Sequence, residues 1–321
     1  MSHLLLTSIP LPWLVSDLVI NGLALWGLLF LVSRSERPVP LLLEVAALSL
    51  LYAAVFENAA VARGNYIYGR SLFMIGDVPA AVPFEEIMIL VMGLAMLRKA
   101  GMPVWSRPLI TGLFGMLQDF SLDPIATRQI FTVNGLTSGR WTWLPDGGPV
   151  NILHIPVYNF SGWQMIMTYG GLCLLVGRAM YRRSGYSART GLIYPLAAAL
   201  VAVILIHTPL SMFALWLWPF FDKGHDSEWV MMGFWIALSL VIIVCCWSRR
   251  RGGGLSWAED WPFFAIPGLW HLFDITSACV AGIYGSLPLM VSISVAHMLL
   301  LAGFFRHPRQ LAQGRTERGA V

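Results

Sequence analysis

Two carboxylates, Asp119 and Asp123, lie four residues apart near the end of an apolar segment. On a helix, that spacing puts both side chains on one face. Two acids that are close together and partly shielded from water cannot both ionise easily, so one is expected to hold its proton near neutral pH. A carboxylic acid that keeps its proton is what a general acid requires. The pair is therefore a candidate for acid–base chemistry, although two solvated loop aspartates would show the same spacing.

Three further acidic residues lie within apolar segments, near their ends. Glu57 lies near the end of the second segment, where it could be solvated or paired with Arg63, and Glu85 and Glu86 lie in the first turn of the third. An acidic residue in a first turn complements the helix dipole, which explains one of these two neighbours. Adjacent helical side chains point about 100° apart, so at least one of the two is expected to face the interior of the bundle. Together with the aspartate pair, these are the candidate catalytic residues.

Aromatic and polar side chains adjoin these acids in sequence. Two tyrosines follow Glu57, and the others belong to the connection 128–159 or to the segment after it. A connection of that length is usually functional or disordered, and its aromatic residues favour packing back onto the bundle. Tyrosines at the headgroup level of a membrane are common without any such role. The candidate substrate-binding residues are Tyr66, Tyr68, Trp141, Trp143, His154, Asn159 and Trp163.

The composition is that of an integral membrane protein. Hydrophobic residues make up 57% of the 321 residues and charged residues only 12%, whereas a soluble domain has about 25% charged residues. A membrane span needs about 20 mostly apolar residues. The windows that qualify are 12–33, 40–62, 82–98, 104–122, 160–180, 191–220, 229–247, 262–282 and 286–305. They predict an all-α, polytopic bundle, with residues 1–305 as one transmembrane domain and 306–321 as a short polar cytoplasmic tail.

The number of spans is nine, or eight if the window 262–282 is excluded, because Pro267, His271 and Asp274 interrupt it. With the N-terminus outside and nine spans, most of the 21 basic residues fall in inner loops and the C-terminal tail, as the positive-inside rule requires. The predicted membrane is a cytoplasmic (inner) membrane of bacterial or archaeal type. The sequence pI of about 9.0 then reflects topology, and no nucleic acid partner is expected.

This topology brings the acids together. The end of the second span, the start of the third, the end of the fourth and the start of the fifth all lie on the outer side. The five carboxylates and Asn159 are therefore expected to line one chamber, floored by apolar helix and walled by the tyrosines and tryptophans.

Several kinds of chemistry lack their motifs. There is no GxGxxG after a strand and no GxxxxGK[ST], the seven histidines are scattered, and the four cysteines show no CxxC spacing. No cofactor and no metal are therefore expected. Carboxylate acid–base chemistry remains, with aromatic rings that could stabilise a cation. Such a chamber suits protonation of an isolated alkene of an isoprenoid, with capture of the tertiary carbocation by water or by another double bond.

Residues 119–163 contain D-x-x-x-D-P, W-x-W, G-G-P and P-x-x-N-F-x-G-W in order. This pattern resembles the membrane carotenoid-biosynthesis family that includes the acyclic carotenoid 1,2-hydratases. Glu57 with Gly64, Tyr66 and Tyr68 fits the same pattern, and the similarity covers roughly residues 45–180. The resemblance implies a cofactor-independent enzyme in the lipid bilayer, a long isoprenoid or carotenoid substrate, and other carotenoid-pathway enzymes as partners. The matching residues are Asp119, Asp123, Pro124, Trp141, Trp143, Gly147, Gly148, Pro149, Pro156, Asn159, Phe160, Gly162 and Trp163.

Two departures keep other reactions open. The segment Pro83-Phe84-Glu85-Glu86 is similar instead to the membrane-type lycopene cyclases and related terpenoid cyclases, and an insertion at Gln129–Gly139 lengthens the loop. Ring closure is thus the alternative to water capture. A Mg²⁺-dependent prenyltransferase, with Asp119/Asp123 and Asp222/Asp226 as paired motifs, and a transporter built on intramembrane carboxylates are less favoured.

Overall fold

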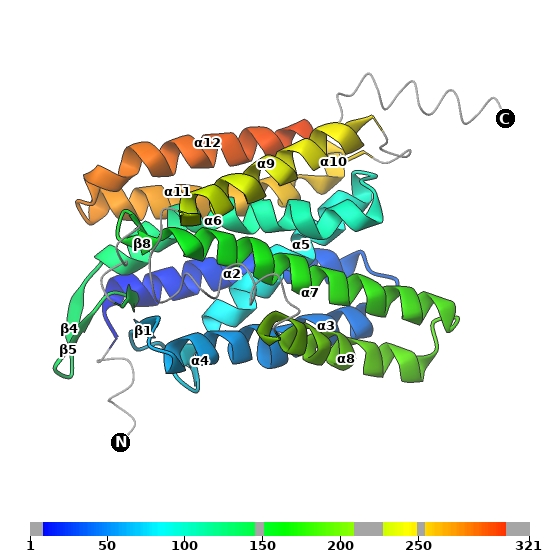
Figure 1. Ribbon diagram of the computed structural model, residues 1–321, viewed down its shortest axis with the longest axis horizontal. Coiled ribbons are helices and arrows are strands. Elements are labelled where there is room, and N and C mark those ends of the chain that lie inside the picture. Colours follow the sequence, from blue (N-terminus) through cyan, green and yellow to red (C-terminus); the bar gives the residue numbers. More distant parts are fainter. Residues whose placement is uncertain (1–8, 145–150, 209–226, 249–253, 306–321) are drawn as a thin grey trace.

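A computed structural model describes residues 9–144, 151–208, 227–248 and 254–305. Long helices packed side by side make up most of this part of the chain (Figure 1). Each predicted window contains a long helix, although α8 ends at His207 and the remainder of the window 191–220 from residue 209 lies outside the described residues. The helices are α2 (Leu11–Ser33), α3 (Pro38–Ala47), η1 (Leu48–Ala53), α4 (Ala54–Ala62), α5 (Ala81–Lys99), η2 (Val104–Ser106), α6 (Arg107–Arg128), α7 (Val157–Arg183), α8 (Ala188–His207), α9 (Ser227–Trp247), α10 (Trp257–Asp260), α11 (Pro262–Val280), η5 (Tyr284–Ser286) and α12 (Leu287–Gly303).

Six helices among the described residues are long and apolar enough to cross a membrane. They comprise α2, the continuous run α3–η1–α4, α8, α9, α11 and η5–α12. This agrees with an integral, all-α membrane protein, whereas nine spans and their orientation remain predictions. The other three long helices, α5, α6 and α7, carry the predicted acids Glu85, Glu86, Asp119 and Asp123 and the amide Asn159.

Helix α6 lies in the middle of the bundle and is buried along almost its whole length. Glycines let its neighbours approach closely, as small residues do in membrane bundles. A Cβ at Gly112 would lie 2.5 Å from Nε2 of Gln164 on α7, and one at Gly93 of α5 would lie 2.7 Å from Cγ2 of Thr111 on α6. Polar groups on α6 are therefore surrounded by other helices.

Short antiparallel strand pairs gather at one end of the bundle, where Figure 1 places the labels β1, β4, β5 and β8. The pairs are β1 (Tyr66–Tyr68) with β6 (Trp141–Trp143), β2 (Met74–Ile75) with β3 (Val78–Pro79), β4 (Phe131–Val133) with β5 (Leu136–Ser138), and β7 (Asn151–Ile152) with β8 (Ile155–Pro156). Because alternate residues of a strand share a face, the register Tyr66↔Trp143 and Tyr68↔Trp141 puts four aromatic rings together.

The connection after α6 packs back onto the helices, as its aromatic residues predicted, whereas the insertion Gln129–Gly139 forms the partly exposed β4–β5 hairpin. The predicted motif at Gly147, Gly148 and Pro149 lies outside the described residues, as do Asp222, Asp226 and the tail 306–321.

From its sequence, Pro124 is expected to mark the end of the fourth helix, but α6 continues through it to Arg128. A proline inside a helix removes one backbone hydrogen bond. Contacts from elsewhere hold the last turn: the Arg140 N–H donates to the Ala126 carbonyl (2.7 Å), and the indole N–H of Trp13 donates to the carbonyl of Gln129 (3.0 Å). These partners come from distant segments, so the local sequence did not reveal them.

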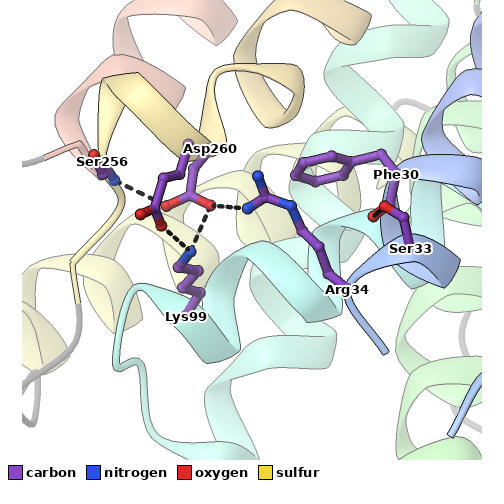
Figure 2. A network of polar contacts seen from close by, with 7 residues as sticks. Phe30, Ser33, Arg34, Lys99, Ser256 and Asp260 are labelled. Carbon is purple, nitrogen blue, oxygen red and sulfur yellow. Dashed lines mark hydrogen bonds and ion pairs between the residues drawn. The ribbon is translucent and has the colours of Figure 1, made fainter. Parts of the chain in front are cut away.

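At the opposite end of the bundle, one buried carboxylate joins three elements (Figure 2). Asp260 of α10 accepts from Arg34 after α2 (3.2 Å), from Lys99 at the end of α5 (2.6 Å) and from the N–H of Ser256 (2.9 Å). The Asp260 side chain is fully buried, whereas Arg34 and Lys99 are partly exposed.

We expect Asp260→Ala to destabilise the protein by about 1–2 kcal/mol, because several charge-assisted hydrogen bonds are lost but their cations can be hydrated. Thermal unfolding in detergent would measure this loss as a lower melting temperature. The control is Glu36→Ala, whose side chain is 88% exposed and forms an ion pair with Arg37. Equal melting temperatures for the two variants would contradict a structural role for Asp260.

Candidate active site

A cavity with about 450 Å³ of empty space lies at the end of the bundle where the strand pairs gather, called the strand end below. It is lined by side chains from α4, α5, α6, α7, α11, β1 and β6. The structure brings together every predicted site residue except His154, and their catalytic and binding roles remain predictions. The lining residues are Glu57, Tyr66, Tyr68, Val82, Glu85, Glu86, Asp119, Leu122, Asp123, Trp141, Trp143, Asn159, Trp163 and Trp270.

The aspartate pair of α6 is bridged by an amide. Nδ2 of Asn159, in the first turn of α7, donates to Oδ2 of Asp119 (2.7 Å) and to Oδ2 of Asp123 (2.9 Å). The indole N–H of Trp141 donates to Oδ1 of Asp123 (2.9 Å). Both oxygens of Asp123 thus accept hydrogen bonds, while Oδ1 of Asp119 is buried without a hydrogen-bond partner among the described residues.

Glu57 accepts hydrogen bonds from both tyrosines of β1. The Tyr66 and Tyr68 hydroxyls lie 2.6 and 2.5 Å from its Oε2 atom. Burial, and then the charge of Glu57, raise the pKa of both tyrosines well above the ordinary value. Each hydroxyl therefore stays protonated and donates a hydrogen bond to the carboxylate. Glu86 adjoins Glu57, and its Oε2 atom has no hydrogen-bond partner within the described part of the chain.

Glu85 takes part in a separate, charge-balanced cluster. Nη2 of Arg140 lies 2.6 Å from Oδ1 of Asp17 on α2 and 3.4 Å from Oε1 of Glu85, and Nδ2 of Asn21 also donates to Glu85 (3.2 Å). Burial acts to lower the pKa of Arg140, but Glu85 and Asp17 outweigh it and the pKa is raised. The guanidinium is therefore charged, and it balances these two acids.

The remaining four carboxyl groups, Glu57, Glu86, Asp119 and Asp123, make no ion pair among the described residues, and all are buried. If several of these groups were ionised without a cation beside them, each charge would cost several kcal/mol of folding free energy in the apolar interior. Some of these groups must therefore be protonated near neutral pH. The cavity thus contains both carboxylic acids and hydrogen-bonded carboxylates.

Aromatic rings form most of the rest of the wall. Tyr66 packs edge-on against Trp143 with ring centroids 4.7 Å apart, and Tyr68 against Trp141 at 5.9 Å. Trp163 of α7 and Trp270 of α11 complete the lining. Electron-rich faces of this kind attract a cation that lies within about 6 Å of the ring centroid.

His154 does not join the cavity. It is exposed, lies in the turn between β7 and β8, and has a positive φ of 70°, so its position is set by that tight turn. Its predicted role in substrate binding has no support from this location.

Sequence reasoning did not assign four groups that build the site. Trp270 and Leu122 line the cavity, and Arg140 and Asp17 balance Glu85. Asp17 carried a detectable signal, because a carboxylate inside an apolar helix needs a partner. Arg140 gave no such signal, because it lies in a connection and its acidic partners lie 55 or more residues away in sequence.

No group of three or more His, Cys, Asp or Glu side chains within the described ranges is arranged to hold a metal ion. The second aspartate pair, Asp222 and Asp226, lies outside those ranges.

We expect Arg140→Met to destabilise the protein by about 3 kcal/mol, because Glu85 and Asp17 would lose their buried counter-ion. Thermal unfolding in detergent would measure this loss, with the exposed Arg128→Met as the control. Adding Glu85→Gln to Arg140→Met should recover part of the stability, since one uncompensated charge is removed. A double variant that is less stable than Arg140→Met would contradict this account of the cluster.

Comparisons of the chain with protein-family models, with curated proteins and with solved structures found no match. The resemblance to the carotenoid 1,2-hydratases therefore depends on the motif residues alone. The function has to be inferred from the chemistry of the cavity.

Proposed function

We propose that this protein modifies the end group of a long isoprenoid, in the first place a carotenoid, by protonating a terminal alkene and adding water to the carbocation. The observation that carries the proposal is a buried cavity in which unpaired carboxyl groups face aromatic rings. Protonation of an alkene needs an acid that holds its proton in a site shielded from water, and the cation that forms needs stabilisation without a nucleophile that captures it too early. No external cofactor is needed for this reaction.

Asp119 is the proposed acid. Asp123 accepts hydrogen bonds on both oxygens from Trp141 and Asn159, so it is suited to the ionised state. An ionised Asp123 makes a second charge on Asp119 unfavourable, and the Oδ1 atom of Asp119 has no other partner in the described structure. A proton on Oδ1 would therefore be free to move to an alkene carbon in the cavity.

Water capture needs a base, and the proposed base is the adjoining pair of Glu57 and Glu86. Glu57 accepts hydrogen bonds from the Tyr66 and Tyr68 hydroxyls, so it is suited to be the ionised member of the pair. Water would add its oxygen to the tertiary cation and lose a proton to this carboxylate, giving a tertiary alcohol. The proton balance closes when that proton returns to Asp119.

The surroundings of the cavity suit a hydrocarbon. Trp270 also lines a second, apolar cavity deeper in the bundle, with about 560 Å³ of empty space between α2, α5, α6, α11 and α12. A mostly apolar lining with a few convergent polar groups is typical of small-molecule sites. An isoprenoid could present its end to Asp119 while its chain lies among apolar side chains.

Cyclisation is the second candidate, because Glu85 and Glu86 follow Pro83 as in the membrane-type lycopene cyclases and Glu86 lies in the cavity. Protonation would be the same, a second double bond would attack the cation, and a carboxylate would remove a proton after ring closure. The prenyltransferase and transporter hypotheses stay untested.

The product decides between the two reactions. In cells that accumulate lycopene, expression of the protein should give a pigment whose mass exceeds that of lycopene by one water. An isomer of unchanged mass would establish cyclisation instead. Mass spectrometry of the extracted pigments measures both, and absence of either product with any acyclic polyene tested would contradict the proposed function.

We expect Asp119→Asn and Asp123→Asn each to lower product formation at least about 100-fold, since general acid catalysis typically contributes that much or more. Asp77→Asn is the matched control, because Asp77 is an exposed acid in the β2–β3 turn at the same end of the bundle. Protein levels in the membrane should be equal in all three. Wild-type turnover in both cavity variants would remove the pair from the mechanism.

A further inference from the structure

The deeper apolar cavity has two polar groups in its wall. Gln118 of α6 and His297 of α12 both line it and are each 2% exposed. Their Nε2 atoms have no hydrogen-bond partner among the described residues. An unpaired buried polar atom costs about 1–3 kcal/mol, so a ligand that pairs with these atoms would gain affinity.

The two groups lie in the same part of the cavity. The His297 ring stacks on Phe114 with centroids 5.6 Å apart, and Gln118 follows Phe114 by one helical turn on α6. Residues four apart on a helix share a face. Gln118 and His297 can therefore reach one small polar group together.

A chain of hydrogen bonds orients His297 from behind. Its Nδ1 atom lies 2.9 Å from Nε2 of His271, and Nδ1 of His271 lies 2.8 Å from the hydroxyl of Ser121. That hydroxyl also donates to Oδ2 of Asp274 (2.9 Å). All four residues are buried. Every ring nitrogen in the chain except Nε2 of His297 thus has a partner.

The direction of these hydrogen bonds decides whether Nε2 of His297 is a donor or an acceptor. If Ser121 donates to an ionised Asp274, each histidine donates from Nδ1, and Nε2 of His297 is an acceptor. If Asp274 is protonated and Ser121 donates to His271, the direction reverses and Nε2 of His297 is a donor. If Ser121 donates instead to the Gln118 carbonyl (2.9 Å), Nε2 of His297 remains an acceptor. A hydroxyl group both donates and accepts, so it satisfies His297 in either case and can accept from Gln118 as well.

We propose that this cavity binds a hydrocarbon chain that carries a hydroxyl group, and that Gln118 and His297 hydrogen bond to that hydroxyl. The isoprenoid character of the chain rests on the proposed function, whereas recognition of the hydroxyl does not. The site selects an alcohol over the corresponding hydrocarbon, because only the alcohol pairs with the two buried nitrogens.

The probe is tritiated farnesol, a short isoprenoid alcohol, bound to the purified full-length protein in detergent. Unlabelled farnesol and its hydrocarbon counterpart farnesene compete for the site. We expect farnesol to displace the label at about tenfold lower concentration than farnesene, the difference that one or two hydrogen bonds provide. Equal displacement by both compounds would overturn the proposal, since water would then satisfy the two nitrogens.

Gln118→Leu and His297→Phe should each bring the farnesol preference close to parity while farnesene binding stays within about twofold. The matched controls are Thr111→Val on α6 and Ser294→Ala on α12, which also remove buried, unpaired polar atoms but lie outside the cavity lining. Both controls should keep the tenfold preference. Loss of the preference in a control, or its retention in both cavity variants, would contradict recognition at this site.

Gly27→Leu tests the location. The atoms nearest to a Cβ at Gly27, in the cavity wall, would belong to the flexible side chains of Met88 and Met92 at 3.4 Å, so the variant should fold. Its longer side chain would fill the cavity, and binding of both farnesol and farnesene should fall at least tenfold. Wild-type binding by a variant with a normal melting temperature would overturn the location.

Asp119→Asn separates this inference from the proposed function. The variant should retain the preference for farnesol although it makes no hydrated product. If wild-type protein has the preference but no activity on any polyene, the proposed function fails and the hydroxyl site stands. If it has activity but no preference, the hydroxyl site fails alone.

Discussion

Burial of carboxyl groups in an apolar bundle, with few positive charges beside them, is the constraint on which this structure depends. Arg140 is the cation that balances Glu85 and Asp17. Glu57 and Asp123 are stabilised by neutral donors instead, namely tyrosine hydroxyls, an indole N–H and an amide. Neutral donors stabilise a carboxylate less completely than a salt bridge does, so this environment favours retention of protons. The same constraint that makes the cavity costly to build thereby keeps protonated carboxyl groups available in it.

Helix α6 supplies polar groups to two separate systems. Asp119 and Asp123 line the cavity that contains the carboxyl groups. Ser121 hydrogen bonds to His271, and Gln118 lines the deeper apolar cavity. Residues two apart on a helix point in nearly opposite directions, so one short segment can serve both sides. Because α6 is enclosed by other helices, each of these groups needs a tertiary partner or a ligand.

The two ends of the bundle use charge differently. At the strand end, acids outnumber cations and surround empty space. At the opposite end, Asp260 contacts Arg34 and Lys99, and Glu44 of α3 forms a bidentate pair with Arg178 of α7 (2.8 and 2.6 Å) and accepts from Tyr194 of α8. There each buried acid has a guanidinium or ammonium partner. These contacts join helix ends, and the strand end keeps carboxyl groups available for chemistry.

The sequence by itself determined where along the chain the helices lie. A segment in lipid must satisfy its own backbone hydrogen bonds, so a long apolar stretch has to be helical. The sequence also predicted that Glu57, Glu86, Asp119 and Asn159 meet, because the ends of the predicted spans that carry them lie on one side, and all four line one cavity. Only the tertiary structure decided that α6 continues through Pro124, that β1 pairs with β6, and that His154 lies apart. It also decided the partners of Arg140 and of the Asp274 chain. Those contacts join side chains up to 153 residues apart, and neither periodicity nor spacing carries information about such pairs.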